Sequence, residues 1–331
     1  MIRTSRMLAV VLGVLLLAGV ALSGCTSSAT QSGTTPAKVT PLPVRIGTLP
    51  TEDSLPLWVA DQRGYFATEG IPKVEMVEFQ SAQERDAAFA SGAIDGFMGD
   101  IIASANLQAG GKPNTITTVM LGADPSQGRF GIVAAPKSGI TTLTALANVP
   151  VGTSSATIQE YVLDGLMSEA GVATAAVKVE EIKKVPVRFE LLMANKIKAA
   201  ALPEPFLSLA EQGGAKIVGD DTKSAHNLSQ TVLVFSNDYL AKPGGAQTVK
   251  GVLSAWDIAA NDINKDPNAY RALLVEKAKL PKSLATTYKV QTYPAHQLPD
   301  KAEVDAILTW MKAKSYLKGG VTYEQLVGQN K

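Results

Sequence analysis

The chain has 331 residues, of which 46% are hydrophobic and 18% are charged, and its formal net charge is +1. This length predicts one to three compact units, and the hydrophobic content is sufficient to build their cores. Nucleic acid is not expected as a partner, because the balanced charge offers no clustered basic face.

The first 24 residues have the pattern of a secretory signal peptide. Arg3 and Arg6 precede an uninterrupted run of apolar residues and glycine, which ends in Leu22-Ser23-Gly24-Cys25. These last residues resemble a bacterial lipobox, which is cleaved before a cysteine that is then diacylated. We therefore predict a signal peptide over residues 1–24 and lipidation of Cys25. The alternative is an uncleaved anchor, for which the run is at the short end of the roughly 17–25 residues that span a membrane.

Cys25 is the only cysteine in the chain. An exported chain with one cysteine forms no internal disulfide, so its fold depends on its hydrophobic core. Residues 26–40 are rich in Ser, Thr, Gly and Ala, a composition typical of flexible linkers. Over residues 25–43 the sequence thus predicts a lipidated cysteine and a tether, which hold an extracytoplasmic domain at the membrane of a bacterial cell envelope.

From Val44 onward, predicted strands alternate with predicted helices, which indicates α/β lobes with mostly parallel sheets. The expected strands are 44–47, 74–79, 115–121, 130–134, 149–152, 177–182, 216–218 and 231–235. The expected helices outside the repeat described next are 57–63, 101–109, 158–170, 249–263, 268–279 and 301–316. The last three helices follow the final strand, so we expect them to pack on a lobe that is already built.

One stretch, Arg85–Asp100, occurs a second time as Arg188–Glu204. Each copy is an amphipathic helix, then a glycine or asparagine of the kind that ends helices, an isoleucine and a short strand of small residues. A carboxylate, Asp100 or Glu204, stands at the carboxyl end of that strand, where open α/β sheets bind their ligands. The repeat predicts two lobes that face a shared cleft; the alternative is chance similarity between two ordinary helix–turn–strand units.

Four segments of the chain read RIGTLPTEDSLPLWVADQRGYFATEGI, ERDAAFASGAIDGFMGD, GTSSATIQEYVLDGLMSEAG and LPEPF. In order and spacing, these segments resemble the SsuA/THI5-like (NMT1-like) substrate-binding proteins of ABC importers. The resemblance covers essentially the whole chain from Val44 to the C-terminal helices. It implies a two-lobed, type II periplasmic-binding-protein fold with a hinge between the lobes, each lobe a mostly parallel sheet flanked by helices.

On this family's plan, lobe 1 comprises residues 44–130 and 236–331, and lobe 2 comprises residues 131–235. The hinge crossings are expected at 130–134 and 231–236. The implied protein closes on one small molecule and delivers it to a membrane permease and its ATPase. We expect a monomer without cofactor or metal, since no nucleophile–base pair or metal cluster is evident.

The loops at helix starts supply one group of candidate ligand residues. Ser154, Ser155 and Thr157 precede the helix 158–170, where free peptide N–H groups and the helix dipole favour an anion. The alternative for Ser155 and Thr157 is a capping role without ligand contact. The resemblance to the family's ligand loop favours contact.

Two loops of the first lobe are further candidates. Gln80 and Ser81 form the equivalent helix start there. The loop from Thr48 to Ser54 follows the first strand and could close over a ligand, or it could be an ordinary solvated loop.

Charged candidates complete the predicted site. Asp100 and Glu204 would suit an amine or amide N–H of the ligand. Their alternatives are an N-cap for Asp100, and a structural turn for Glu204, which lies between two prolines. Arg188 stands near a helix start, where the dipole disfavours a cation, so it needs a ligand anion or an acidic side chain as its partner.

These cues point to different solutes. The hydroxyl-rich helix start suits a sulfonate-, taurine- or nitrate-like anion, whereas two carboxylates favour an amine or a nitrogen heterocycle such as a pyrimidine precursor of thiamine. The resemblance also includes an enzyme, a thiamine-pyrimidine synthase, whose cysteine-rich motif is missing here. A solute sensor would need an attached signalling domain. The sequence therefore predicts a binding protein that is not an enzyme.

Overall fold

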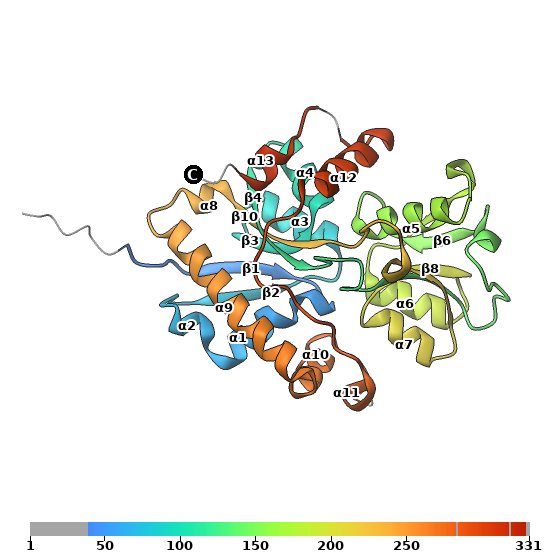
Figure 1. The fold of residues 1–331 in the computed structure, drawn as a ribbon, viewed down its shortest axis with the longest axis horizontal. Helices are drawn as coiled ribbons and strands as arrows, with labels where there is room; N and C mark the ends of the chain where they lie inside the picture. Colours follow the sequence, from blue (N-terminus) through green and yellow to red (C-terminus); the bar gives the residue numbers. More distant parts are fainter. Residues whose placement is uncertain (1–38, 283, 318, 329–331) are drawn as a thin grey trace, which may run out of the picture. The chain divides into compact units, whose positions relative to one another are not determined.

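Two five-stranded sheets organise the structure, and helices flank each of them (Figure 1). The computed structural model describes residues 39–282, 284–317 and 319–328, so the predicted signal peptide, the lipidation of Cys25 and most of the tether lie outside the described residues. The described residues belong to one compact unit that begins at Val39. We call the part built on the first sheet the first lobe, and the part built on the second sheet the second lobe. The predicted α/β fold class is confirmed.

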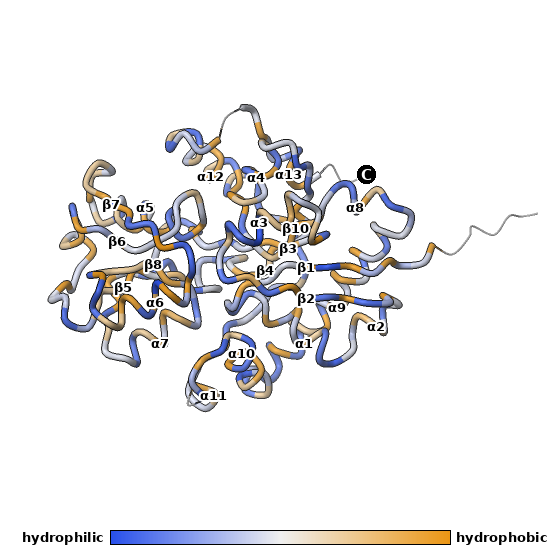
Figure 2. The backbone as a smooth tube through the Cα atoms, turned by 180° about the vertical axis from the view of Figure 1, so that it is seen from behind, coloured by the Kyte–Doolittle hydropathy of each residue, from blue (hydrophilic) through white to orange (hydrophobic). Residues whose placement is uncertain are grey.

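The first sheet has the strand order β2-β1-β3-β10-β4. Its strands are β1 (Val44–Thr48), β2 (Val74–Glu78), β3 (Gly96–Asp100), β4 (Asn114–Leu121) and β10 (Thr231–Ser236). β1 is parallel to β2 and β3, while β10 is antiparallel to β3 and β4, so one strand opposes the direction of the rest. β3 and β10 are buried almost throughout and carry hydrophobic colour in Figure 2, as expected of strands covered on both faces.

The second sheet repeats this arrangement with the order β7-β6-β8-β5-β9. Its strands are β5 (Phe130–Ala134), β6 (Pro150–Thr153), β7 (Lys178–Glu181), β8 (Ala199–Pro203) and β9 (Lys216–Asp220). β6 is parallel to β7 and β8, and β5 is antiparallel to β8 and β9. The two antiparallel strands, β5 and β10, therefore occupy equivalent positions in their sheets.

The strand Thr231–Ser236 differs from its predicted assignment. The sequence placed residues 231–235 in the second lobe, but this strand pairs with β3 and β4 and so belongs to the first sheet. The physical reason is that the chain returns here from the second lobe, and the strand inserts antiparallel between β3 and β4, which lie much earlier in the sequence. An antiparallel insertion of this kind leaves no signal in the local pattern of apolar residues.

The sequence repeat corresponds to two equivalent helix–strand units, which contain α3 (Ala82–Ala90) and α6 (Val185–Met193). After each helix the chain passes through a positive φ, at Gly92 and Asn195. The isoleucine that follows then covers a glycine of the neighbouring strand. A Cβ added to Gly47 would lie 2.6 Å from the Ile94 side chain, and one added to Gly152 would lie 2.8 Å from that of Ile197.

The remaining helices cover the two sheets, and the C-terminal ones pack on the first lobe as predicted. The earlier helices are α1 (Leu55–Arg63), α2 (Tyr65–Thr68), α4 (Ile101–Ala109), α5 (Ile158–Glu169) and α7 (Phe206–Gln212). The C-terminal ones are α8 (Asn237–Leu240), α9 (Gly245–Lys265), α10 (Arg271–Lys277), α11 (Leu284–Thr287), α12 (Lys301–Ala313) and α13 (Tyr323–Val327). α9 packs against α1 and α2, whereas α12 packs against α4 and α13 against β4.

Candidate ligand-binding site

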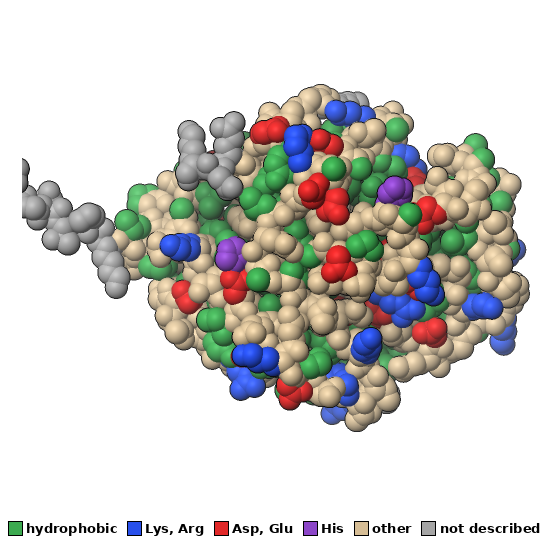
Figure 3. Space-filling view, in the orientation of Figure 1, with side chains coloured by type: hydrophobic (Ala, Val, Ile, Leu, Met, Phe, Trp, Pro, Cys, Tyr) green, Lys and Arg blue, Asp and Glu red, His purple; other side chains and the backbone are tan. Residues whose placement is uncertain are grey.

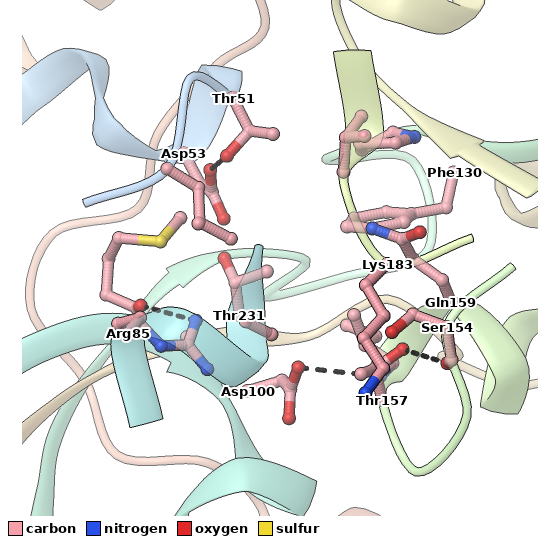
Figure 4. Close-up of a pocket in the computed structure, with 17 residues that line it drawn as sticks. Thr51, Asp53, Arg85, Asp100, Phe130, Ser154, Thr157, Gln159, Lys183 and Thr231 are labelled. Atoms are coloured by element: carbon pink, nitrogen blue, oxygen red, sulfur yellow. Dashed lines mark hydrogen bonds between the residues drawn. The ribbon is translucent and has the colours of Figure 1, made fainter. Parts of the chain in front are cut away.

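A small cavity lies between the two lobes, at the carboxyl ends of β3 and β8 (Figure 4). Its polar lining comes from both lobes: Thr51, Asp53, Arg85, Asp100 and Thr231 from the first, and Ser154, Thr157, Gln159 and Lys183 from the second. Its volume is about 30 Å³, which leaves room for only a few water molecules. This position, outside the carboxyl ends of strands, is where α/β sheets place their ligands.

The wall formed by the first lobe carries two buried carboxylates, Asp53 and Asp100, which are 5% and 4% exposed. The Thr51 hydroxyl donates to Asp53 Oδ1 at 2.6 Å, and the Ala103 peptide N–H donates to Asp100 Oδ1 at 2.7 Å. Burial raises the pKa of Asp53 to about 6 and also raises the pKa of Asp100, while the nearby charge of Arg85 opposes both shifts. Neither carboxylate forms an ion pair among the described residues, because Arg85 pairs with Asp86 instead.

Asp53 is held in place by the short helical turn η1 (Glu52–Ser54). The Glu52 carboxylate accepts hydrogen bonds from the Gln291 peptide N–H at 2.7 Å and from the Tyr288 hydroxyl. The Tyr293 hydroxyl donates to the Glu52 carbonyl oxygen at 2.8 Å. A segment near the C-terminus thus fixes the turn that presents Asp53 to the cavity.

The Arg85 guanidinium bonds groups of its own lobe. Its Nε and Nη2 atoms donate to Asp86 Oδ1 at 2.9 and 2.7 Å, and its Nη1 donates to the Met98 carbonyl oxygen at 2.8 Å. The guanidinium carbon also lies 4.7 Å from the centre of the Phe97 ring. Arg85 therefore has an acidic side chain of the protein as its partner, the arrangement that the sequence left open as an alternative for Arg188.

Arg188, the equivalent arginine of the second lobe, lacks such a partner because Phe189 takes the place of Asp86. The side chain is fully buried, and Nη2 donates to Gln159 Oε1, but Nε and Nη1 have no hydrogen-bond partner among the described residues. Desolvation lowers the pKa of Arg188 to about 9, although the charge of Glu181 opposes the shift. Arg188 does not line the cavity, and it touches the lining through Gln159.

The peptide N–H groups at the start of α5, which the sequence assigned to a ligand anion, already bind carboxylates of the chain. The Ser155 N–H donates to Glu181 at 2.9 Å, and the Ala156 N–H donates to Glu160 at 2.8 Å. The Ile158 N–H donates to Asp100 of the opposite lobe at 3.4 Å. The helix start therefore favours anions as predicted, and in this structure the anions are the protein's own side chains.

The corresponding helix start in the first lobe is also satisfied internally. The Gln80 N–H donates to Glu84 at 3.1 Å, and the Ser81 hydroxyl accepts from the Glu84 N–H at 3.3 Å. Ser81 thus caps α3, and neither residue lines the cavity.

The structure brings three of the predicted ligand residues together at the cavity: Asp100, Ser154 and Thr157. Ser155 lies beside them in sequence but outside the lining. Thr48 and Ser54 are buried in the first lobe, where the Ser54 hydroxyl donates to the Leu49 carbonyl oxygen at 3.1 Å.

Glu204 lies apart from this cavity. Its carboxylate accepts from the Ser208 hydroxyl at 2.8 Å and the Ser208 N–H at 3.1 Å, and it pairs with Arg129 at 3.4 Å. Burial raises the pKa of Glu204. Its contacts therefore agree with the alternative of a structural role in the turn.

The predicted ligand residues leave out six polar residues of the lining: Thr51, Asp53, Arg85, Gln159, Lys183 and Thr231. Asp53 lies inside the loop from Thr48 to Ser54 that was singled out as a candidate lid, so its residue type was an available signal. Thr231 was assigned to the wrong lobe. Gln159 lies inside a predicted helix and Lys183 between two predicted elements, and neither position has a distinctive pattern.

Direct contacts join the two lobes around this site. Gln83 Nε2 donates to Ser154 Oγ at 2.6 Å, and Lys184 pairs with Glu84 at 2.9 Å. Farther out, Lys314 pairs with Glu160 of α5 at 2.8 Å. The cavity is therefore small because side chains of the two lobes meet across it.

Other features of the described residues limit the possibilities. None of their helices has the length and apolar character required to cross a membrane. Within the same residues, no cluster of three or more His, Cys, Asp or Glu side chains is placed to hold a metal ion. Positive and negative side chains are interspersed on the face shown in Figure 3.

Comparisons with known proteins show where this fold recurs. A model of the NMT1-like family matches residues 37–276, whereas no curated protein matches the chain. The alkanesulfonate-binding protein SsuA from Xanthomonas axonopodis pv. citri superposes with a TM-score of 0.72 at 18% identity, over 85% of this chain and 96% of that one. The periplasmic aliphatic sulphonate-binding protein SsuA from Escherichia coli gives 0.71 at 21% identity, over 88% and 94%. The periplasmic nitrate-binding protein NrtA from Synechocystis PCC 6803 gives 0.69 at 15% identity, over 86% and 84%.

Proposed function

This chain belongs to the NMT1-like family, and we propose that it is the extracytoplasmic substrate-binding protein of an ABC importer. The observation that carries the proposal is one cavity at the strand ends, lined by polar side chains from both lobes. The fold shared with sulfonate- and nitrate-binding proteins supports it.

The proposed activity is capture of a small organic solute by closure of the lobes. A solute that touches both lobes stabilises the closed arrangement by the contacts it makes only there. A permease and its ATPase then take the solute from the closed protein. We propose no turnover, because Cys25 is the only cysteine and the proposed lipid attachment site, so the cysteine-rich motif of the thiamine-pyrimidine synthase is missing.

The solute classes suggested by the sequence are a sulfonate-, taurine- or nitrate-like anion and a pyrimidine-like thiamine precursor. Ser154, Thr157 and Asp100 are the predicted residues best placed to contact it. Arg188 supports the acceptor end of the solute through Gln159, because its buried charge has no carboxylate partner of its own among the described residues. We propose that the protein is a monomer, anchored to the membrane through a lipid on Cys25.

A solute screen by thermal denaturation tests this function. The mature chain from residue 25, carrying Cys25→Ser so that it is not lipidated, is mixed with sulfonates, taurine, nitrate, pyrimidines and amino acids. Binding at a hundredfold excess over Kd adds about 2.7 kcal/mol to the free energy of unfolding, which raises the melting temperature measurably. If no solute in the set raised the melting temperature, or if a bound solute were chemically converted, the proposal would be wrong.

A further inference from the structure

The charges around the cavity are distributed unevenly. In the first lobe, the carboxylates of Asp53, Asp86 and Asp100 surround the single guanidinium of Arg85. Arg85 forms its hydrogen bonds with Asp86 and a carbonyl oxygen, so it leaves Asp53 and Asp100 without a bonded cation. The wall formed by the first lobe therefore holds negative charge in excess when all three carboxylates are ionised.

The start of α5 offers an anion few free peptide donors, and the cation that the second lobe brings to the lining is Lys183. The peptide N–H groups of Ser155, Ala156 and Ile158 are bound to carboxylates of the chain. The Thr157 hydroxyl donates to the Ser154 carbonyl oxygen at 2.7 Å. An anion placed against the first lobe would in addition be repelled by two buried carboxylates.

We propose that the solute carries a protonated nitrogen, and that Asp53 together with Asp100 receives it. This inference rests on the proposed function and names the solute class of the same site. Both carboxylates point toward the cavity from the first lobe in Figure 4, with Gln159 and Lys183 facing them from the second. The nitrogen supplies the counter-charge that a buried carboxylate otherwise lacks.

Asp53 is the residue that distinguishes such solutes from neutral ones. Both carboxylate oxygens of Asp100 already accept hydrogen bonds, from the peptide N–H groups of Ala103 and Ile158. The Asp53 carboxylate accepts from the Thr51 hydroxyl and bonds the Thr231 side chain, but no lysine or arginine among the described residues donates to it. A charged N–H donor on the solute therefore gains most at this carboxylate.

Matched solute pairs test the inference on the mature chain carrying Cys25→Ser. One pair is 2-aminoethanesulfonate and 2-hydroxyethanesulfonate, and the other is benzylamine and benzyl alcohol; in each pair only the first member carries, at the varied position, a nitrogen that is protonated at neutral pH. Affinities are measured by calorimetry at pH 7.5, where Asp53 is mostly ionised in the free protein. We expect the nitrogen-bearing member of at least one pair to bind about tenfold tighter than its partner, as expected for a hydrogen bond to a charged group.

The substitution Asp53→Asn should remove this preference while leaving the fold intact, because it keeps the side-chain shape and removes a buried charge. Asp238→Asn, at an exposed position of α8 in the same lobe, is the control and should change neither affinity nor preference. If solutes without a protonatable nitrogen bound as well or better, and Asp53→Asn bound like wild type, the inference would be overturned and the proposed function would stand. If no solute of these pairs or of the wider screen bound, the inference and the proposed function would both be refuted.

Discussion

The carboxylate of Asp100 in the first lobe accepts a hydrogen bond from the peptide N–H of Ile158 in the second, at 3.4 Å. Its other oxygen accepts from the Ala103 N–H at 2.7 Å. A single side chain therefore caps the first turn of α4 in its own lobe and of α5 in the opposite lobe. Separation of the lobes must break the hydrogen bond from Ile158, whereas the one from Ala103 can remain.

Asp100→Asn should weaken the bond between the lobes selectively. The Asn carbonyl oxygen can still accept from the Ala103 N–H, but its amide nitrogen cannot accept from the Ile158 N–H. Hydrogen exchange measured residue by residue should therefore become faster at Ile158 and stay nearly unchanged at Ala103. Ser81→Ala is the matched control, because Ser81 caps α3 within one lobe. Equal acceleration at both amides would contradict the assignment.

The two arginines of the repeat should respond differently to replacement by methionine. Arg85→Met leaves the buried Met98 carbonyl oxygen unpaired and removes the partner of Asp86, so we expect a loss of about 3 kcal/mol in the free energy of unfolding. Arg188→Met removes a buried cation that has no carboxylate partner among the described residues, and it should change stability by less than about 1 kcal/mol.

Denaturant unfolding of both variants measures this difference. A loss at Arg188 as large as that at Arg85 would show that a group within the protein pairs with Arg188. Solute affinity is the second quantity to measure, since we expect Arg188→Met to weaken binding although the protein remains stable.

The fold could be predicted from sequence far better than the site. The helix Ile101–Ala109 and the strand Phe130–Ala134 were predicted with the bounds that the structure shows, because apolar runs ended by glycine or proline mark them locally. Thr231 was misplaced, since strand insertion depends on contacts between segments far apart in the chain. Asp53 was missed because the sequence shows only a carboxylate in a polar loop, which is normally solvated. In the structure a distant segment that includes Tyr288 and Tyr293 buries the turn that carries Asp53.

Stability should fall as the pH rises, and Glu52 should be a principal cause. Burial raises the pKa of Glu52 to about 8, with the like charge of Glu204 adding to the shift. A carboxyl whose pKa is higher in the folded than in the unfolded state stabilises the protein below its unfolded pKa, and this stabilisation is lost as the pH rises through the folded value. Asp53, with a pKa of about 6, and Asp221, with one of about 7, act in the same direction.

Glu52→Gln isolates the contribution of this group. The Gln carbonyl oxygen can accept from the Gln291 N–H, and the variant cannot ionise. At pH 9 we expect it to be more stable than wild type by up to about 5 kcal/mol, since the pKa rises from 4.5 to about 8 and each pKa unit corresponds to about 1.4 kcal/mol, and nearly equal to wild type at pH 4. Melting temperatures between these pH values provide the test, and parallel curves for the two proteins would refute it.

Lys314 should control how firmly the lobes are joined. Its ammonium group lies 2.8 Å from Glu160 and 2.9 Å from Asp164, both on α5 of the second lobe, while its own backbone follows α12 of the first. Lys314→Met removes this bridge and leaves the two carboxylates facing an apolar side chain, which should cost the closed arrangement roughly 1–2 kcal/mol. Because a solute must then supply that free energy on binding, its affinity should fall by about tenfold or less.

Lys301→Met is the control, since Lys301 pairs with Asp305 and Glu324 within the first lobe. Small-angle scattering should show a larger radius of gyration for the first variant and not for the second; the same radius for both would mean that this ion pair does not hold the lobes together.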